Sequence, residues 1–299
     1  MLMSQEIPAA TVLTTTATTT TTTVEAVARQ KGLSIESLSF AYQDTVVLSD
    51  INLVIGEGEF VSLLGPSGSG KTTLLRLLAG MESPASGCIA CEGKVVDRPG
   101  IDRGMVFQDY SLFPWMNLAE NVILAVARAN PQLVKKQRRV LAGEYLDLVG
   151  LQDVRLKYPF ELSGGMQQRG AIARALALGS PYLLMDEPFG ALDPVNRMKL
   201  QNLLIQVWRD SSPSKTVVFV THDVDEALYL GDRVVILGSS PGRIIAEIPV
   251  HHSRPRNRAA FFATTEFREL RDQILDYFRL DAIEQLERAE RIKSNGEGI

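Results

Sequence analysis

The sequence has few of the residues that cross-link a chain, and it lacks long apolar runs. It contains only two cysteines in 299 residues, too few for a disulfide framework, so we expect a reducing compartment. No run of about 18 apolar residues occurs, which excludes an obvious membrane-spanning helix. The N-terminus lacks the basic head and apolar core of a secretory signal. These absences predict a protein that is neither secreted nor embedded in a bilayer.

Neither positive nor negative charge is in large excess. The chain has 31 Lys and Arg against 35 Asp and Glu, for a net charge of −4. A strongly basic face for nucleic acid is therefore not expected. With 45% apolar and 22% charged residues, the composition is that of an ordinary globular protein with enough core to fold unaided.

Composition divides the chain into three parts. Ten of the thirteen residues from 11 to 23 are threonine, so we expect segment 1–31 to be disordered, with a β-strand as the alternative. Residues 32–250 carry the regular patterns of a folded domain. The remainder, 251–299, begins as a basic, proline-containing linker and continues into an amphipathic helix predicted over 266–280.

Hydrophobic periodicity predicts an α/β domain. Strand-like stretches dominate the beginning, helical spacing dominates from about 112 to 178, and strands then alternate with helices. This order predicts a mostly parallel sheet with a helical subdomain at about 109–178. The predicted strands are 33–40, 46–55, 59–64, 87–97, 182–185, 216–220, 233–237 and 244–248, and the predicted helices are 71–79, 118–129, 135–149, 165–178, 195–208 and 224–230.

A glycine-rich loop lies between an apolar strand and a leucine-rich helix. Its residues are Gly65, Pro66, Ser67, Gly68, Ser69, Gly70, Lys71 and Thr72. Glycines let the backbone wrap around a phosphate chain, and the following helix directs its N-terminal N–H groups at an anion. The lysine can reach the β- and γ-phosphates, and the Thr72 hydroxyl can bind Mg²⁺. The loop therefore predicts a binding site for a nucleoside triphosphate.

Two acids end the apolar strand predicted at 182–185. In α/β sheets ligands bind at the carboxyl ends of strands, so Asp186 is placed to hold Mg²⁺ directly or through water. Adjacent residues of a strand point to opposite sides, so Glu187 has a different role. We interpret it as the group that polarises an attacking water.

A second candidate anion site lies further along the chain. Leu162-Ser163-Gly164-Gly165-Met166-Gln167-Gln168-Arg169 leads into a helix, with Ser163 as a plausible N-cap and the glycines exposing backbone N–H groups. One nucleotide does not easily occupy both sites of one chain. This segment therefore suggests that two chains share their nucleotides.

With the phosphate loop and this segment in that order, residues 33–250 resemble the ATP-binding subunit of ABC transporters. The resemblance implies the P-loop NTPase core of ABC type: a mostly parallel sheet, an antiparallel β subdomain and a helical subdomain. It also implies hydrolysis of ATP with Mg²⁺ as cofactor. Asp193, in Ala191-Leu192-Asp193, resembles the D-loop at the dimer interface.

The resemblance implies a role for each matching residue. The catalytic residues would be Lys71, Gln108, Glu187 and His222. The Mg²⁺ ligands would be Thr72, Gln108 and Asp186. The nucleotide-binding residues would be Tyr42, Gly65, Pro66, Ser67, Gly68, Ser69, Gly70, Lys71, Thr72, Thr73, Ser163, Gly164, Gly165, Gln167 and Asp193.

Looser motifs resemble those of the nitrate, sulfonate and taurine importers. They are Phe113-Pro114-Trp115-Met116 and Ser239-Ser240-Pro241-Gly242-Arg243-Ile244. The resemblance implies membrane permease subunits as partners, a second ATPase chain in a homodimer, and an indirect link to a substrate-binding protein. It places the chain at the cytoplasmic face of a bacterial inner membrane. Phe113 and Trp115 would contact the permease, although core aromatics are the alternative.

Three other interpretations remain to be weighed. A soluble ABC ATPase outside transport usually carries two ATPase modules or a long coiled coil, and this chain shows neither. A phosphate-loop kinase would lack the 162–169 segment. Cys88 and Cys91 lie three apart in a predicted strand and so face opposite sides, which argues against a shared metal. The transported solute is not encoded in an ATP site.

Overall fold

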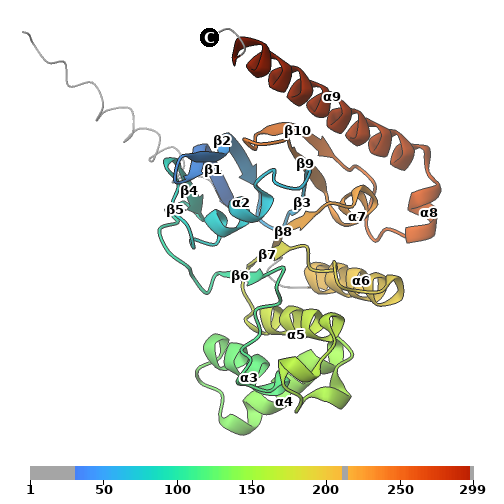
Figure 1. Ribbon diagram of the computed structural model, residues 1–299. Helices are drawn as coiled ribbons and strands as arrows, with labels where there is room; N and C mark the ends of the chain where they lie inside the picture. Colours follow the sequence, from blue (N-terminus) through green and yellow to red (C-terminus); the bar gives the residue numbers. More distant parts are fainter. Residues whose placement is uncertain (1–30, 211–214, 297–299) are drawn as a thin grey trace, which may run out of the picture.

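A computed structural model describes residues 31–210 and 215–296 of the chain (Figure 1). The predicted disorder of the Thr-rich tract concerns residues outside this range. Two β-sheets form the centre of the molecule, and a group of helices forms a separate lobe below them (Figure 1). Among the described residues, no helix combines the length and the apolar character needed to cross a membrane.

The larger sheet has six strands in the order β10-β9-β3-β8-β7-β6. Its strands are β10 Ile244–Pro249, β9 Arg233–Leu237, β3 Phe60–Leu64, β8 Thr216–Thr221, β7 Tyr182–Asp186 and β6 Arg103–Val106. All are parallel except β10, which runs antiparallel to β9 at the edge. Every residue of β3, β7 and β8 is buried, as expected for parallel strands covered on both faces.

The smaller sheet is antiparallel, with the order β2-β1-β4-β5. Its strands are β1 Leu33–Tyr42, β2 Thr45–Ile55, β4 Ser86–Cys91 and β5 Lys94–Val95. Helix α2 (Lys71–Leu78) packs between the two sheets, because its leucines share one core cluster with residues of β1, β2, β7 and β8. The smaller sheet therefore covers α2 on the side that faces away from the large sheet.

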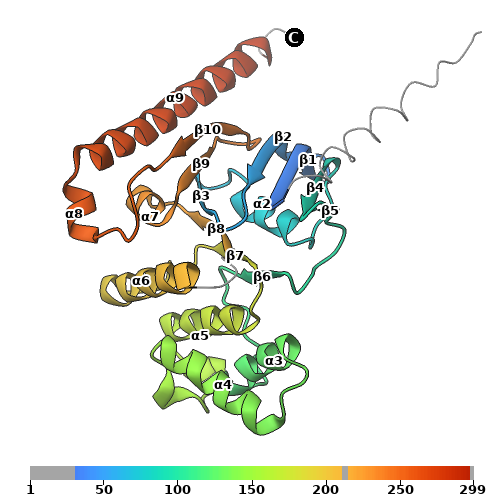
Figure 2. The same cartoon turned by 180° about the vertical axis from the view of Figure 1, so that it is seen from behind.

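The other helices cover the opposite face of the large sheet and form the lower lobe. They are α3 Leu118–Ala129, α4 Lys135–Leu148, α5 Gly164–Ala177, α6 Pro194–Asp210, α7 Val224–Leu230, α8 Arg258–Ala263 and α9 Thr265–Gly296, with short 3₁₀ turns at Gln152–Val154 and Pro159–Glu161. Helices α3, α4 and α5 pack on one another, with α5 nearest the sheet (Figures 1 and 2).

Two local features show why the lower lobe forms as it does. Asn117 caps α3 through a reciprocal pair of bonds with Glu120, which satisfies the first N–H groups of that helix. Buried Asn121 accepts a bond from Phe113 N at 2.8 Å and donates to Phe113 O and Met116 O. Its amide thereby fixes the conformation of segment 113–116.

The C-terminal part differs most from the sequence prediction. The helix predicted over 266–280 extends as α9 from Thr265 to Gly296, and a further short helix, α8, precedes it. The predicted linker is not simply solvated. Arg256 is buried and donates to three carbonyls at the end of α7, namely those of Leu228, Tyr229 and Gly231, at 2.7–3.0 Å.

The reason is that the last carbonyls of a helix need donors. Burial lowers the pKa of Arg256 to about 10, and its bonds to carbonyls compensate for the lost hydration. Neighbouring Arg254 bonds Asp232 at 2.7 Å and lies 4.5 Å from the Trp208 ring centroid. These two arginines hold the C-terminal segment against the domain.

Candidate active site

The candidate site lies at the carboxyl edge of the large sheet. The glycine-rich loop follows β3, Gln108 follows β6, Asp186 ends β7, and His222 follows β8. The parallel registers pair Leu64 with Thr221 and Asp186 with Val220, so these strand ends lie at one level. This is the edge where α/β proteins bind ligands.

The glycine-rich loop has the geometry of an anion cradle. Gly68 and Gly70 have φ values of +81° and +86°, which strain any other residue. A Cβ at Gly70 would lie only 2.6 Å from Leu48 Cδ2. Lys71 Nζ donates to Gly65 O and Pro66 O, both at 2.8 Å. Burial lowers the pKa of Lys71, opposed by the charges of Glu187 and Asp186.

An oxygen-rich cavity lies beside this loop. Thr72 Oγ1 donates to Asp186 Oδ1 at 3.2 Å, and Thr72, Asp186 and Gln108 line one cavity of about 350 Å³ together with Arg76. Asp186 is 2% exposed, and burial raises its pKa although the Thr72 bond opposes the shift. Hydroxyl, carboxylate and amide oxygens are the donors that Mg²⁺ prefers. The three predicted metal ligands therefore come together in a set that fits this ion.

Glu187, the next residue, contacts His222. Its Oε2 lies 3.3 Å from His222 Nδ1. The Glu187 backbone has a φ of +45°, uncommon for a residue with a side chain. Its N–H donates to Val220 O at 3.1 Å, which anchors this turn to β8. The two neighbouring carboxylates therefore have different partners, Thr72 for Asp186 and His222 for Glu187.

The predicted second anion site forms the start of α5. Ser163 Oγ accepts a bond from Met166 N at 3.3 Å, as expected of an N-cap, and Gly164 and Gly165 form the first turn. Gln167 Nε2 donates to the Leu162 carbonyl at 3.2 Å. Helices α5 and α2 pack against opposite faces of the large sheet. The two helix N-termini that could bind phosphate therefore belong to different sides of the molecule.

Two further predicted residues lie at the periphery. Tyr42 ends β1, is 41% exposed, and packs edge-on against Phe40 with ring centroids 4.8 Å apart. Its ring is thus partly open to a stacking partner. Asp193 caps α6 by accepting bonds from Val195 N and Asn196 N at 3.1 and 3.0 Å. The backbone bond from Asn196 is the main cause that lowers the pKa of Asp193.

Comparison with known proteins decides the family. Residues 48–190 match the family described as "ABC transporter". The chain is 43% identical over 233 residues to the nitrate import ATP-binding protein NrtD of Synechococcus elongatus, covering 78% of this chain and 84% of that protein. The chain belongs to the ABC transporter family. It is an ABC-type ATPase.

Other relatives of this ABC ATPase differ in the solute they are named for. The bicarbonate transport ATP-binding protein CmpD of a Synechocystis strain is 42% identical over 250 residues, covering 82% of this chain and 88% of that protein. The aliphatic sulfonates import ATP-binding protein SsuB of Bacillus subtilis is 41% identical over 260 residues, covering 86% and 97%. These names support the predicted resemblance to importers of small anions.

A solved structure confirms the predicted fold class. The chain matches the dimeric structure of MJ0796, described as a bacterial ABC transporter cassette, with a TM-score of 0.68 and 33% identity over 74% of this chain and 100% of that one. Another structure of MJ0796, a dimer in a post-hydrolysis state bound to ADP and Pi, matches with a TM-score of 0.66 and 32% identity, at the same coverage.

The sequence prediction missed one residue of the site, Gln168. It is 1% exposed on the buried face of α5. Its Nε2 donates to Glu187 O at 3.0 Å, and its Oε1 accepts from Ala191 N at 3.0 Å. One amide therefore fixes the backbone on both sides of the turn after β7. The signal in the sequence was a polar residue on the apolar stripe that continues with Ala171 and Ala175.

Replacing Gln168 by Met is expected to lower kcat for ATP hydrolysis about tenfold to a hundredfold, because a small displacement of Glu187 costs that much in rate. ATP affinity should stay within about twofold, since no contact with the phosphate loop is lost. Steady-state ATPase and equilibrium ATP binding measure both. Gln206→Met, at an exposed position of α6, is the control. Wild-type kcat in Gln168→Met would refute this role.

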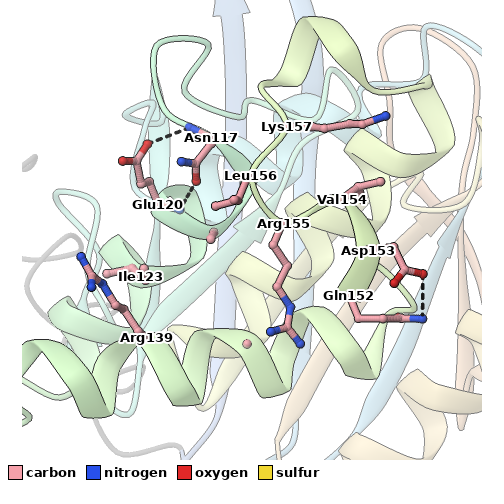
Figure 3. A pocket seen from close by; sticks show the side chains of 12 residues that line it. Asn117, Glu120, Ile123, Arg139, Gln152, Asp153, Val154, Arg155, Leu156 and Lys157 are labelled. Atoms are coloured by element: carbon pink, nitrogen blue, oxygen red, sulfur yellow. Dashed lines mark hydrogen bonds between the residues drawn. The ribbon is translucent and has the colours of Figure 1, made fainter.

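A separate cavity of about 740 Å³ lies in the lower lobe of the ABC ATPase, between α3, α4 and segment 152–157 (Figure 3). Most of its polar groups have local structural partners. Arg155 pairs with Asp147 of α4, and Gln152 bonds Asp153 at 3.4 Å. The Arg155 side chain lies between the loop and α4 in Figure 3. This cavity therefore reflects the packing of the lobe and holds none of the predicted site residues.

Proposed function

We propose that the chain is the ATP-hydrolysing subunit of an importer for a small anion, working through a separate membrane permease. The observation that carries the proposal is the meeting of Thr72, Asp186, Glu187 and His222 at one sheet edge beside the glycine-rich loop. The importer class rests on the relatives named for nitrate, bicarbonate and sulfonate. Taurine belongs to the same proposed range of solutes.

The proposed chemistry follows from these positions. Loop N–H groups, Ser69, Lys71 and Thr73 would bind the phosphates, and Tyr42 would stack on the base. Thr72, Asp186 and Gln108 would hold Mg²⁺, which supplies charge neutralisation at the β- and γ-phosphates. Glu187 would accept a proton from the attacking water, and His222, 3.3 Å from its Oε2, would help to orient that water. Lys71 would stabilise charge that develops on the transferred phosphoryl group.

Two copies of the chain would complete the two sites. The start of α5 and the start of α2 pack on opposite faces of the sheet, so Ser163, Gly164, Gly165 and Gln167 are best used by the nucleotide of a second chain. Asp193 would lie at that interface. We therefore infer a homodimer with two competent sites, supported by the dimeric MJ0796 structures.

The permease would dock on the lower lobe beside Gln108. A cavity of about 470 Å³ there is lined by Phe107, Phe113, Leu124 and Arg128, among others. Trp115 is 70% exposed at its edge and packs on Phe113, with centroids 5.5 Å apart. An apolar cleft with an exposed tryptophan suits a helix of a partner protein. The chain would then lie peripherally at the cytoplasmic face of the membrane, with the substrate-binding protein on the far side.

We also propose three regions for this subunit. These are 1–31, the Thr-rich N-terminal segment, of which residues 1–30 lie outside the part of the chain that the structure describes; 32–250, the ATPase domain with its helical subdomain at about 109–178; and 251–299, a C-terminal extension. Buried Arg256 supports the view that this last region docks on the domain.

Replacing Trp115 by Ser is expected to weaken permease binding about thirtyfold, because losing a tryptophan anchor costs about 2 kcal/mol. Basal ATPase of the free chain should not change. Copurification and titration with the permease in detergent measure the effect. Leu156→Ser is the matched control, since Leu156 is 79% exposed and lines the other cavity. An equal loss in both variants would place the docking surface elsewhere.

The proposed function itself is tested in proteoliposomes that contain the chain, its permease and its binding protein. We expect nitrate, bicarbonate, a sulfonate or taurine to stimulate ATP hydrolysis and to accumulate inside. Stimulation by an unrelated solute would correct the substrate class. A chain that hydrolyses ATP but binds no membrane protein would instead support a soluble ABC ATPase.

A further inference from the structure

A buried chain of hydrogen bonds joins the C-terminal segment to the end of strand β8. Arg258, the first residue of α8, donates through Nη1 to Gln201 Oε1. Gln201 Nε2 donates to Glu226 Oε1 at 2.7 Å, and Thr221 Oγ1 donates to Glu226 Oε2 at 2.5 Å. Gln201, Glu226 and Thr221 are all at most 6% exposed. None of these four residues belongs to the hydrolytic site described above.

Arg258 determines the orientation of the Gln201 amide, and the charge of Glu226 determines the direction of the Thr221 bond. An arginine has only donors, so it must face the carbonyl oxygen of the Gln201 amide. The NH₂ group of Gln201 then faces Glu226, which must accept. An ionised Glu226 accepts on both oxygens, so the Thr221 hydroxyl donates to it. Burial raises the pKa of Glu226, and the bonds from Thr221 and Gln201 oppose the shift and favour its charged form.

The Thr221 hydroxyl also bonds the backbone of Asp223, the residue after His222. While it donates to Glu226, it accepts a bond from Asp223 N at 3.0 Å. This bond spans His222, so a single oxygen fixes the backbone before and after the histidine. Asp223 in turn caps α7 by accepting from Glu226 N at 3.1 Å. His222 projects from this turn to within 3.3 Å of Glu187.

The other end of the chain depends on the C-terminal segment. The Arg258 guanidinium lies 4.9 Å from the ring centroids of both Tyr229 and Phe262. Tyr229 belongs to α7 and Phe262 to α8, so the guanidinium is held between the domain and its extension. Figures 1 and 2 both show α8 beside α7, where the chain turns into α9.

We propose that Glu226 is a positioning residue for His222, acting through Thr221, and that Arg258 of the C-terminal segment orients Glu226 through Gln201. The inference rests on the proposed function, because it assigns these residues to the hydrolysis of ATP. It gives the C-terminal extension a role in the reaction although no residue of the extension touches the site. An extension that undocks removes Arg258 and releases the turn that carries His222.

The first test is a double-mutant cycle in the full chain. Thr221→Val keeps the shape and removes the donor, and we expect kcat to fall about tenfold or more with KM for ATP within about twofold. Arg258→Met should lower kcat about threefold to tenfold, since the Gln201 amide is then free to rotate. The double variant should match Thr221→Val alone, because both changes act through Glu226. Arg279→Met is the control, because Arg279 pairs with Asp276 on the exposed side of α9.

The second readout does not depend on turnover. The chain has three histidines, so the C2–H signal of His222 can be assigned in an NMR spectrum by its loss in His222→Gln. Arg258→Met and Thr221→Val should both change the C2–H chemical shift of His222 and leave that of His251 unchanged. A thermal melt checks that each variant is folded. If one is unfolded, Glu226→Gln takes its place, because a glutamine cannot accept hydrogen bonds from Gln201 and Thr221 on both side-chain ends.

The outcomes separate the two proposals. Unchanged kcat and an unchanged C2–H chemical shift of His222 in these variants would overturn the inference, as would rate losses that simply multiply in the double variant. A wild-type chain without ATPase activity would overturn the proposed function. In that case the His222 signal would still decide whether Arg258 and Thr221 control the position of the histidine.

Discussion

Glu187→Gln is expected to lower kcat for ATP hydrolysis about a thousandfold while ATP still binds. General-base catalysis by a placed carboxylate contributes about 10² to 10⁴ in rate. Gln has nearly the same shape as Glu, so the turn with a φ of +45° and its bond to Val220 O should persist. The amide cannot take up a proton at neutral pH. The loss is therefore confined to the chemical step.

Single-turnover phosphate release measures this loss, and calorimetry measures ATP affinity. Because ATP would close the dimer and hydrolysis would reopen it, the variant should also elute as a dimer in ATP and Mg²⁺. Glu269→Gln, at an exposed position of α9, controls for removing a charge. If Glu187→Gln hydrolysed ATP within tenfold of wild type, another group would have to activate the water.

Much of the site could be predicted because its residues directly follow buried strands. The strands β3, β7 and β8 are apolar runs, and each ends where a loop glycine, an acid or a histidine begins. In a parallel sheet those ends share one edge, so a one-dimensional pattern already implies a cluster in space. The facing of Glu187 and His222 needed the structure, because it depends on a positive φ at Glu187.

Strand β6 could not be predicted for a local reason. Its sequence, Arg103-Gly104-Met105-Val106, is short and begins with a charge and a glycine, both uncommon in strands. Pairing with β7 supplies the stability that its own residues lack. Its position nonetheless matters, because it delivers Gln108 to the cavity shared with Asp186.

Buried polar residues were the second kind of omission. Gln168, Gln201, Glu226 and Arg256 all look like surface residues by type, yet each is at most 6% exposed. Their partners come from elements distant in sequence, such as Gln201 of α6 with Glu226 of α7. A single sequence does not reveal such pairs. They explain how a basic stretch predicted to be a linker becomes part of the domain.

Lys71→Ala should remove most of the ATP affinity of the chain. Truncating one partner of a desolvated, charged hydrogen-bond set costs about 2 to 5 kcal/mol, or about thirtyfold to several-thousandfold in Kd. Lys71 Nζ bonds Gly65 O and Pro66 O, and the lysine is 7% exposed. Its loss removes one donor from each carbonyl, of which Pro66 O keeps a bond from Ser69 N at 3.2 Å.

Two consequences of Lys71→Ala can be told apart. The lost bonds to these carbonyls should lower the free energy of unfolding by about 1 to 3 kcal/mol, which urea titration without nucleotide measures. The missing charge should weaken ATP binding further, which a fluorescent ATP analogue measures. Lys136→Ala, at an exposed position of α4, should change neither. If Lys71→Ala bound ATP as tightly as wild type, the loop would not be the phosphate site. If only stability fell, the lysine would serve to close the loop and its charge would have no part in binding.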